Sequence, residues 1–294
     1  MKIVEINKLT KYYNHGKILG VKNLTLDVDA GEIFGFIGPN GAGKSTTIRL
    51  LLDLIMPTSG SASIFGLNIH TDTIQIKKNI GYLPGEIFLP DVLTGDSCIK
   101  YYGGFKQDID KKYLADLIQR FDLDTKRKVK DYSKGNKQKI AVVLALMHKP
   151  KLLILDEPTS GLDPLNQAEF YKIIRETKKF GATTFFSTHI LEEAEKLCDR
   201  VGIIKEGELL KIENIDEFRE KNIREIHIDT SSVLPLSTLK QEGVTKIERT
   251  TTGYHLITTG KNGKILQSLA KFDIEDIKVS EPSLEEIFMH YYKK

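Results

Sequence analysis

The segment that most constrains the fold is Gly38 to Thr46, which reads Gly-Pro-Asn-Gly-Ala-Gly-Lys-Ser-Thr. It fits the pattern G-x-x-x-x-G-K-[ST], in which a strand runs into a glycine-rich loop and a helix leaves it. The apolar stretch Glu32 to Ile37 predicts the strand, and the helical period of apolar residues from Thr46 to Ile55 predicts the helix. We therefore expect backbone N–H groups and a helix N-terminus to face a phosphate group.

Two side chains of this loop have chemistry suited to a nucleotide. Lys44 adds a positive charge for phosphate oxygens, and Ser45 adds a hydroxyl suited to Mg²⁺. A glycine-rich turn before a helix, without any ligand, is the alternative, but it does not account for Lys-Ser at the end of the pattern. The other loop residues expected at the nucleotide are Asn40, Gly41, Ala42, Gly43 and Thr46.

A second constellation follows two strands of buried type. Leu152 to Leu155 is a continuous apolar run that ends in Asp156-Glu157, and the strand from Ala182 to Thr188 ends in His189. Ligands of parallel sheets lie at the carboxyl ends of strands, so these groups should lie beside the phosphate loop. A solvated pair of loop acids and a structural histidine are the alternatives.

Each of these three groups has an expected role. We expect Asp156 to hold magnesium, directly or through water, and Glu157 to orient the attacking water as a general base. His189 can hydrogen-bond a γ-phosphate or that water. The residue types therefore predict hydrolysis of a nucleoside triphosphate.

Two further features have a ligand interpretation and a structural one. Tyr12-Tyr13 lies between expected strands at residues 2–9 and 24–28, where an exposed ring could stack on a purine or simply pack inward. Ser133 precedes a helix that runs to about His148. Its hydroxyl and the amide of Gly135 could face an anion, although serine caps are common without one.

Bulk properties exclude some classes of function. The chain has 294 residues, is 40% hydrophobic and carries a net charge of +3, too small for binding nucleic acid or membranes by bulk attraction. The longest apolar run, Ile140 to Met147, is well short of the roughly 20 residues that cross a bilayer. The start of the chain lacks the apolar core of a signal peptide, and Cys98 and Cys198 are expected to be reduced thiols of a cytosolic protein.

The composition changes after residue 214. The pattern beyond it predicts the order βαββαβ of ferredoxin-like folds and a closing helix from Leu284 with the capping box Ser283-x-x-Glu286. Its histidines lack ligand spacing and are interpreted as surface or packing residues; they are His227, His255 and His290. The predicted strands and helices are 225–229, 235–241, 245–248, 254–258, 264–270 and 276–279, in chain order.

The expected fold is therefore α/β, with two domains. Residues 1–214 should form a nucleotide-binding domain with a mostly parallel core sheet, an N-terminal antiparallel β subdomain and a helical subdomain at about 87–148. The helical pattern there runs from Asp96 to Phe121. Residues 215–294 should form a small α+β accessory domain.

Taken together, the phosphate loop, Tyr132 to Asn136, Leu152 to Glu157, Ser160 to Asp163 and His189 resemble the ATP-binding subunit of an ABC transporter. The resemblance covers about residues 2–212, with every motif in family order. The segment Tyr132 to Asn136, here called the signature, distinguishes this family from other P-loop ATPases, which lack it.

The resemblance implies a P-loop NTPase that uses ATP and Mg²⁺ and whose nucleotide-binding domains dimerise head to tail. Each ATP would lie between the phosphate loop of one domain and the signature of the other. Ser133 and Gly135 would then act in trans, Asp163 would cross the dimer interface, and Tyr13, rather than Tyr12, would stack on adenine.

The sequence departs from the family pattern at two places. The family's signature usually reads Leu-Ser-Gly-Gly-Gln, and here Tyr132, Lys134 and Asn136 differ while the serine and second glycine remain. The loop expected to supply a glutamine to magnesium has Gly85 at that position. Glu86, the next residue, is the alternative oxygen ligand.

The resemblance also implies partners. Leu83 to Glu86, the signature and Pro282 to Phe288 are similar to the drug, antibiotic or sodium exporter branch. The implied partners are a second nucleotide-binding domain, expected to be another copy of this chain, and a separate transmembrane permease that places it on the cytoplasmic face of the membrane. No nucleic-acid partner is expected.

Two other functions remain as alternatives. The first is a soluble ABC-type ATPase in translation or DNA maintenance, but such proteins usually carry two ATPase domains or a long coiled-coil insertion. The second is a module that binds nucleotide without hydrolysing it, against which Asp156, Glu157 and His189 argue.

Overall fold

The fold is described from a computed structural model, and the residues described are 1–14, 16–106, 109–215, 217, 223–259 and 262–280. The chain divides into two compact units, Met1–Ile212 and Glu213–Lys294, and each is described by itself. The predicted closing helix, with Ser283, Leu284, Glu286 and His290, lies outside the described residues, as does the segment Pro282 to Phe288.

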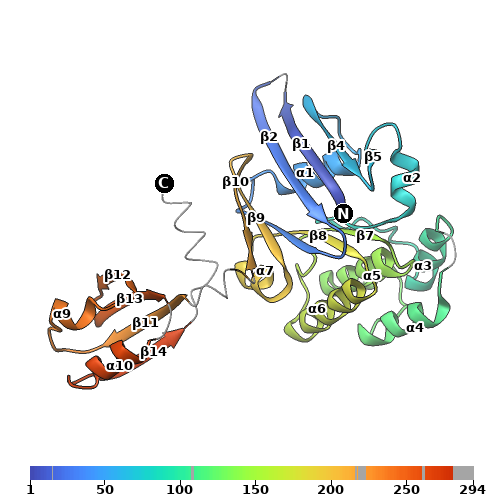
Figure 1. The fold of residues 1–294 in the computed structure, drawn as a ribbon. Helices are drawn as coiled ribbons and strands as arrows, with labels where there is room; N and C mark the ends of the chain where they lie inside the picture. The colour runs from blue at the N-terminus through green and yellow to red at the C-terminus, as the bar shows by residue number, and fades with distance from the viewer. Residues whose placement is uncertain (15, 107–108, 216, 218–222, 260–261, 281–294) are drawn as a thin grey trace. The chain divides into compact units, whose positions relative to one another are not determined.

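A six-stranded sheet forms the centre of the first unit (Figure 1), in the order β10-β9-β3-β8-β7-β6. The pairings β6·β7, β7·β8, β3·β8 and β3·β9 are parallel. Every residue of β3, β7 and β8 is buried, as expected of parallel strands covered on both faces. The mostly parallel core is thereby confirmed. The strands are β3 (Ile33–Ile37), β6 (Ile80–Leu83), β7 (Leu152–Asp156), β8 (Thr183–Thr188), β9 (Arg200–Lys205) and β10 (Glu208–Asn214).

A four-stranded sheet in the order β2-β1-β4-β5 contains the N-terminal strands. β1 (Lys2–Tyr13) and β2 (Ile18–Asp29) are antiparallel and longer than the predicted 2–9 and 24–28. Their register shifts between Ile6 and Leu9, and Lys8 has a φ of 48°, so the side-chain alternation that marks a strand is interrupted. The remaining strands are β4 (Ser59–Ile64) and β5 (Leu67–Asn68).

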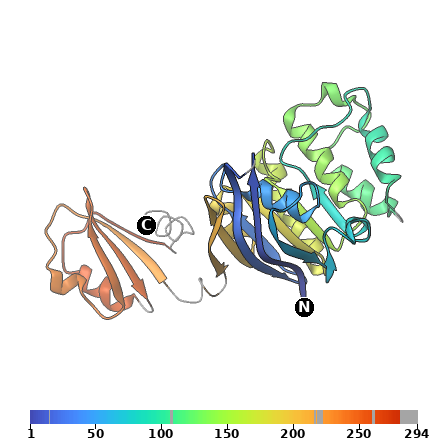
Figure 2. The same ribbon diagram turned by 90° about the horizontal axis from the view of Figure 1, so that it is seen from above.

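Three helices lie together at one end of this unit, as the green ribbons in Figure 2 show: α3 (Gly95–Gly103), α4 (Lys111–Arg120) and α5 (Lys134–Leu146). The sequence predicted one helical stretch from Asp96 to Phe121, whereas the structure divides it. α3 ends at Gly103-Gly104, and Asp110 caps α4 by accepting hydrogen bonds from the N–H groups of Lys112 and Tyr113. The other helices of the unit are α1 (Lys44–Leu51), α2 (Thr73–Lys78), α6 (Pro164–Lys179) and α7 (Leu191–Leu197).

The second unit is an antiparallel sheet in the order β12-β13-β11-β14 with two short helices. The predicted βαββαβ order is present, and the sheet order is that of a split βαβ arrangement. Its elements are β11 (Ile223–Asp229), α9 (Leu236–Leu239), β12 (Val244–Arg249), β13 (Gly253–Thr259), α10 (Gly263–Leu269) and β14 (Asp276–Ser280). Its core contains Ile226, Ile228, Leu239, Leu256, Ile265 and Leu269.

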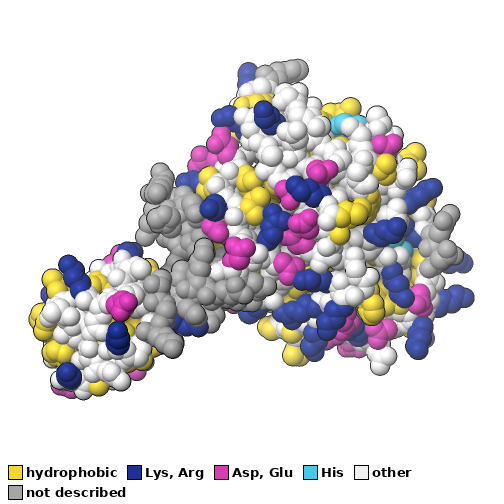
Figure 3. All heavy atoms as spheres, in the orientation of Figure 1, with side chains coloured by type: hydrophobic (Ala, Val, Ile, Leu, Met, Phe, Trp, Pro, Cys, Tyr) yellow, Lys and Arg dark blue, Asp and Glu magenta, His cyan; other side chains and the backbone are white. Residues whose placement is uncertain are grey.

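The surface of the first unit carries charges of both signs. On the face shown in Figure 3, basic and acidic side chains are interspersed with apolar ones. Among the described residues, no helix has the length and apolar character needed to span a membrane.

Candidate nucleotide site

The loop after β3 has a backbone that only glycine adopts without strain. Gly41 has a φ of 80° and Gly43 a φ of 108°, both in the left-handed region. A Cβ added at Gly43 would lie 2.5 Å from the carbonyl oxygen of Gly20. The loop therefore turns tightly into α1, which begins at Lys44, with a geometry suited to an anion at the helix N-terminus.

Lys44 is the central side chain of this loop. It is 5% exposed, and its Nζ donates to the carbonyl oxygens of Gly38 at 2.7 Å and Pro39 at 3.0 Å. Burial lowers the pKa of Lys44, while the carboxylates of Glu157 and Asp156 act in the opposite direction. A buried ammonium group whose partners are mostly neutral carbonyls is suited to an additional anion.

The other predicted loop residues differ in exposure. Asn40 and Gly41 are exposed, Gly43, Ser45 and Thr46 are half-buried, and Ala42 is buried. The surface offered to a ligand therefore consists of the loop tip and the first turn of α1.

Glu157, at the end of β7, contacts both other predicted catalytic groups. Its Oε1 lies 3.7 Å from Lys44 Nζ and 3.1 Å from His189 Nδ1. Glu157 has a φ of 48°, an unusual backbone for a non-glycine residue, and its N–H donates to the carbonyl oxygen of Ser187 at 3.2 Å. Such strain is concentrated at functional sites. The structure thus brings together residues that follow β3, β7 and β8.

Asp156 is 5% exposed and accepts a hydrogen bond at Oδ1 from Ser187 Oγ, at 2.5 Å. Ser187 is fully buried in β8, and sequence reasoning missed it. The signal available was a polar Ser-Thr pair at the carboxyl end of an otherwise buried strand. The hydroxyl of Ser187 fixes the Asp156 carboxylate and also accepts a hydrogen bond from the N–H of Glu157, at 3.3 Å.

Gly85 lies beside the other Asp156 oxygen. A Cβ added at Gly85 would lie 3.2 Å from Asp156 Oδ2, so the absence of a side chain leaves that oxygen room for a ligand. Glu86 is exposed. Asp156, Ser45 and Glu86 all carry the hard oxygen atoms that Mg²⁺ prefers.

Tyr13, at the end of β1, lies beside the phosphate loop. Its Oη is 3.2 Å from Thr46 Oγ1, and Lys11 Nζ lies 5.4 Å from the centroid of its ring. Tyr12 is placed differently, because its N–H donates to Thr58 Oγ1. Of the two tyrosines, Tyr13 is the one that contacts the loop.

Ser133, Gly135 and Asp163 form a separate group. Ser133 caps α5 by accepting from Asn136 N at 3.2 Å, and Asp163 caps α6 by accepting from Asn166 N at 3.0 Å. This backbone hydrogen bond is the main cause that lowers the pKa of Asp163.

Gly135 lies close to the segment that precedes the second cap. A Cβ on it would lie 2.8 Å from the carbonyl oxygen of Gly161, so the signature packs closely against the segment that leads to Asp163. Among the described residues, no hydrogen bond or ion pair links Ser133, Gly135 or Asp163 to the loop at 38–46. In the described part of one chain, these hydrogen bonds and ion pairs thus do not connect the phosphate loop with the signature.

The chain is similar to known ATP-binding proteins of transport systems. Residues 21–160 match the family model described as ABC transporter, and residues 211–292 match that of the C-terminal domain of DrrA1-3-like ATP-binding proteins. The chain is 36% identical to the bacitracin transport ATP-binding protein BcrA of Bacillus licheniformis, over 98% of this chain and 96% of that protein. It is 38% identical to the linearmycin resistance ATP-binding protein LnrL of Bacillus subtilis, over 67% of this chain and 65% of that protein.

Solved structures show the same fold. An ATP-binding subunit of an ABC transporter superposes with a TM-score of 0.69 at 32% identity, covering 74% of this chain and 92% of that one. A dimeric ATP-binding cassette bound to ADP and Pi, in a post-hydrolysis state, gives 0.65 at 24% identity, over 72% of this chain and 99% of that one. The second likeness concerns the fold alone.

The contacts of Ser187 generate a stability prediction. Ser187→Ala should lower the free energy of unfolding by about 1 to 3 kcal/mol, because a buried carboxylate loses a hydrogen bond. Thr184→Val, on the same strand, is the matched control: Thr184 is fully buried, and its Oγ1 has no hydrogen-bond partner among the residues that the structure describes. The control should be neutral or stabilising. Denaturant unfolding of both variants checks this, and equal losses would contradict the role given to Ser187.

Proposed function

The chain belongs to the ABC transporter family and is an ABC-type ATPase, and on that premise we propose that it powers a membrane exporter through ATP-driven pairing of two nucleotide-binding domains. The observation that carries the catalytic part is the meeting of Lys44, Glu157 and His189 at the ends of parallel strands. The names of BcrA and LnrL, a bacitracin transport protein and a linearmycin resistance protein, favour an antibiotic or drug as cargo.

The proposed chemistry assigns one task to each residue. Lys44 and the loop N–H groups bind the phosphates of ATP. Glu157 accepts a proton from water while the water oxygen attacks the γ-phosphorus. The bond between the γ-phosphorus and the β,γ-bridging oxygen then breaks, which yields ADP and phosphate. His189 hydrogen-bonds the γ-phosphate or that water. Ser45 and Asp156 would hold Mg²⁺, with Glu86 as a further candidate, and the ion would neutralise charge on the phosphates.

ATP should compete with Glu157 for the Lys44 ammonium group. The Lys44 ammonium is 3.7 Å from Glu157 Oε1, and a γ-phosphate at the helix N-terminus would compete for it. Release of Glu157 from Lys44 would leave the carboxylate free to accept a proton. Substrate binding would thereby activate the base.

The separation of the signature from the phosphate loop supports a site shared between two copies. Ser133 and Asp163 cap adjacent helices and are exposed, so they are accessible to another molecule. The amide of Gly135 lies at the N-terminus of α5, where an anion is favoured. Head-to-tail pairing would place this surface on the ATP held by the partner copy's loop.

An apolar groove of about 450 Å³ supports a permease contact on the helical subdomain. Phe88 is 82% exposed and Phe105 71% exposed at this groove, which also reaches Tyr82 and Pro84. Pro84 adjoins Gly85, where an added Cβ would lie 3.2 Å from Asp156 Oδ2, so one loop borders both the groove and the proposed magnesium ligand Asp156. We infer that a cytoplasmic segment of the permease docks here.

The alternative of a soluble ABC ATPase in translation or DNA maintenance is less well supported. The sequence has one phosphate loop, and the face in Figure 3 carries charges of both signs. The relatives compared above are named for transport and resistance.

Replacement of the proposed base tests the ATPase mechanism. Glu157→Gln should leave ATP affinity nearly unchanged, lower turnover by about 10² to 10⁴ and stabilise an ATP-bound dimer, because the variant cannot accept the proton. Phosphate release and size-exclusion chromatography with ATP measure both effects. Glu192→Gln, 78% exposed on α7, is the control and should behave like the parent. Turnover at the parent rate in Glu157→Gln would refute the catalytic role and favour a different base.

Stacking on adenine has its own test. Tyr13→Ala should weaken ATP binding by about 5- to 150-fold, the equivalent of the 1 to 3 kcal/mol that a base stack contributes, whereas Tyr13→Phe keeps the ring and most of the affinity. Tyr12→Ala serves as the control and should bind like the parent. Isothermal titration calorimetry measures the dissociation constant for ATP. Equal losses of ATP affinity in Tyr12→Ala and Tyr13→Ala would argue against a stack on Tyr13.

The groove can be tested on membranes. Phe88→Ser should lose association with the permease while the detached chain keeps its ATPase activity, since the groove lies outside the phosphate loop. Phe180→Ser, 89% exposed at the end of α6 and outside the groove, is the matched control. Co-purification of the permease from detergent extracts provides the readout. Loss of the permease only in Phe180→Ser would place the contact elsewhere.

A further inference from the structure

A cluster of metal-binding residue types lies on the sheet of the second unit. Glu225 and His227 are two positions apart on β11 and therefore point to the same face of the sheet. In the strand registers His227 pairs with His255 of β13, and His255 pairs with Glu248 of β12. The apolar residues between them, such as Ile226, belong to the core on the opposite face.

The pairing adds a contact that the sequence did not predict. His227 and His255 were interpreted as surface or packing residues because they lack ligand spacing. Antiparallel pairing of β11 and β13 stacks their rings, with centroids 4.3 Å apart and planes 19° apart. Spacing along the chain carries no information on such a contact.

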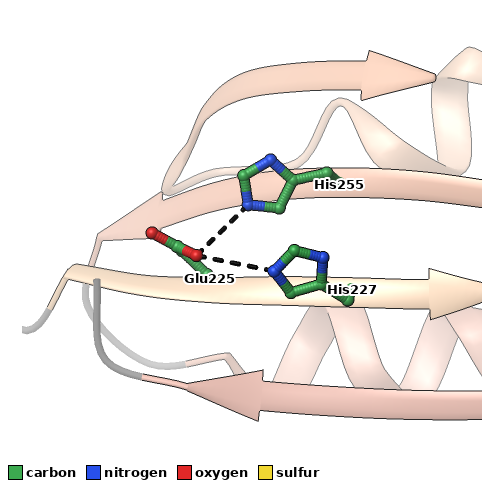
Figure 4. A group of neighbouring side chains, drawn as sticks. All are labelled: Glu225, His227 and His255. Carbon is green, nitrogen blue, oxygen red and sulfur yellow. Dashed lines mark ion pairs between the residues drawn. The ribbon is translucent and has the colours of Figure 1, made fainter. Parts of the chain in front are cut away.

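The carboxylate lies between the two rings' Nε2 atoms, as Figure 4 shows. Glu225 Oε2 is 3.4 Å from His255 Nε2 and 3.5 Å from His227 Nε2. The three ligand atoms all lie within 4.8 Å of one another. Glu225 is 7% exposed, His255 12% and His227 47%, so the cluster is accessible mainly from the His227 side.

Two atoms of this cluster lack the partners that buried polar atoms need. Among the described residues, Glu225 Oε1 and His255 Nε2 are buried without a hydrogen bond. A buried carboxylate oxygen or imidazole nitrogen without a hydrogen bond raises the free energy of the folded state. A divalent cation would satisfy the carboxylate and both imidazole nitrogens at once.

We propose that Glu225, His227 and His255 bind a zinc ion in the second unit. Imidazole nitrogen and carboxylate oxygen are established zinc ligands at about 2.0 to 2.2 Å, and a tetrahedron of such bonds has edges of about 3.3 to 3.6 Å. The nitrogen–oxygen distances of 3.4 and 3.5 Å match those edges. Three protein ligands leave the fourth position to water.

The surroundings of His255 support this assignment. Its other ring nitrogen, Nδ1, is 3.8 Å from Glu248 Oε2, so a carboxylate lies near the ring atom that would face away from the ion. Lys246 Nζ in turn lies 2.7 Å from Glu248 Oε1. A magnesium site is a poor alternative, because Mg²⁺ prefers oxygen ligands.

The site would act on the second unit without taking part in ATP hydrolysis. Its ligands come from β11 and β13, so bound zinc would link two adjacent strands. A ligand that binds only the folded state raises its stability. The inference stands independently of the proposed transport function.

The test is zinc binding to the full-length, nucleotide-free chain, measured by competition with a chromophoric chelator. The parent should bind one zinc per chain, and His227→Asn should weaken binding at least tenfold. His227 is 47% exposed, so this substitution should leave the fold intact, which far-UV circular dichroism verifies. The matched control is His189→Asn, which removes another histidine 3.1 Å from a glutamate, in the nucleotide site, and should keep the zinc.

Cobalt provides a second readout, because four-coordinate Co²⁺ absorbs visible light. The parent and His189→Asn should show these bands, and His227→Asn and Glu225→Gln should lose them. Absence of zinc binding in the parent, equal binding in the parent and His227→Asn, or loss of zinc in His189→Asn alone would each overturn the proposal. Displacement of zinc by equimolar Mg²⁺ would do so as well.

Discussion

The buried ammonium group of Lys44 is the constraint on which the first unit depends. A lysine with 5% exposure needs anionic or carbonyl partners, and the structure supplies them from two directions. The carbonyls of Gly38 and Pro39 come from its own loop, and Glu157 comes from the end of β7. Both elements reach the same point only because β3, β8 and β7 are neighbouring parallel strands that end together. The sheet order is thus a condition for the site.

The polar groups around this lysine form a connected set. Ser187 bonds Asp156, and Thr188, the next residue, donates to Glu193 at 2.6 Å. Glu193 is 3% exposed and also accepts from Tyr171 Oη at 3.2 Å and from Thr159. The segment between β7 and α6 is therefore bonded to α6 and α7 through one buried carboxylate. Such satisfied networks make the position of Glu157 specific, because alternative positions would leave buried groups unpaired.

Much of this could be predicted from the sequence, because its signals are local. The phosphate loop, the buried run that ends in Asp156 and the Ser133 cap each combine a backbone conformation with nearby residues, and each lies where the pattern indicates. Ser187 and Glu193 carry no such signal, since their roles arise from strands and helices distant in sequence. The divided helix at Gly103 and the bulged β1 were missed for another reason: a periodic pattern continues across a break in the backbone.

In the second unit, too, the contacts that matter join residues distant in sequence and have no local sequence signal. A helix or a short loop brings metal ligands together at recognisable spacings, but an antiparallel sheet does so at any separation that the register allows. His227 and His255 face each other because β11 and β13 pair, and Glu225 joins them because a strand returns to the same face every second residue. The opposite face holds the apolar core, so these polar residues occupy the side on which the sheet alone determines their neighbours. In such a sheet, a cluster of ligand side chains can be recognised only after the strand register is known.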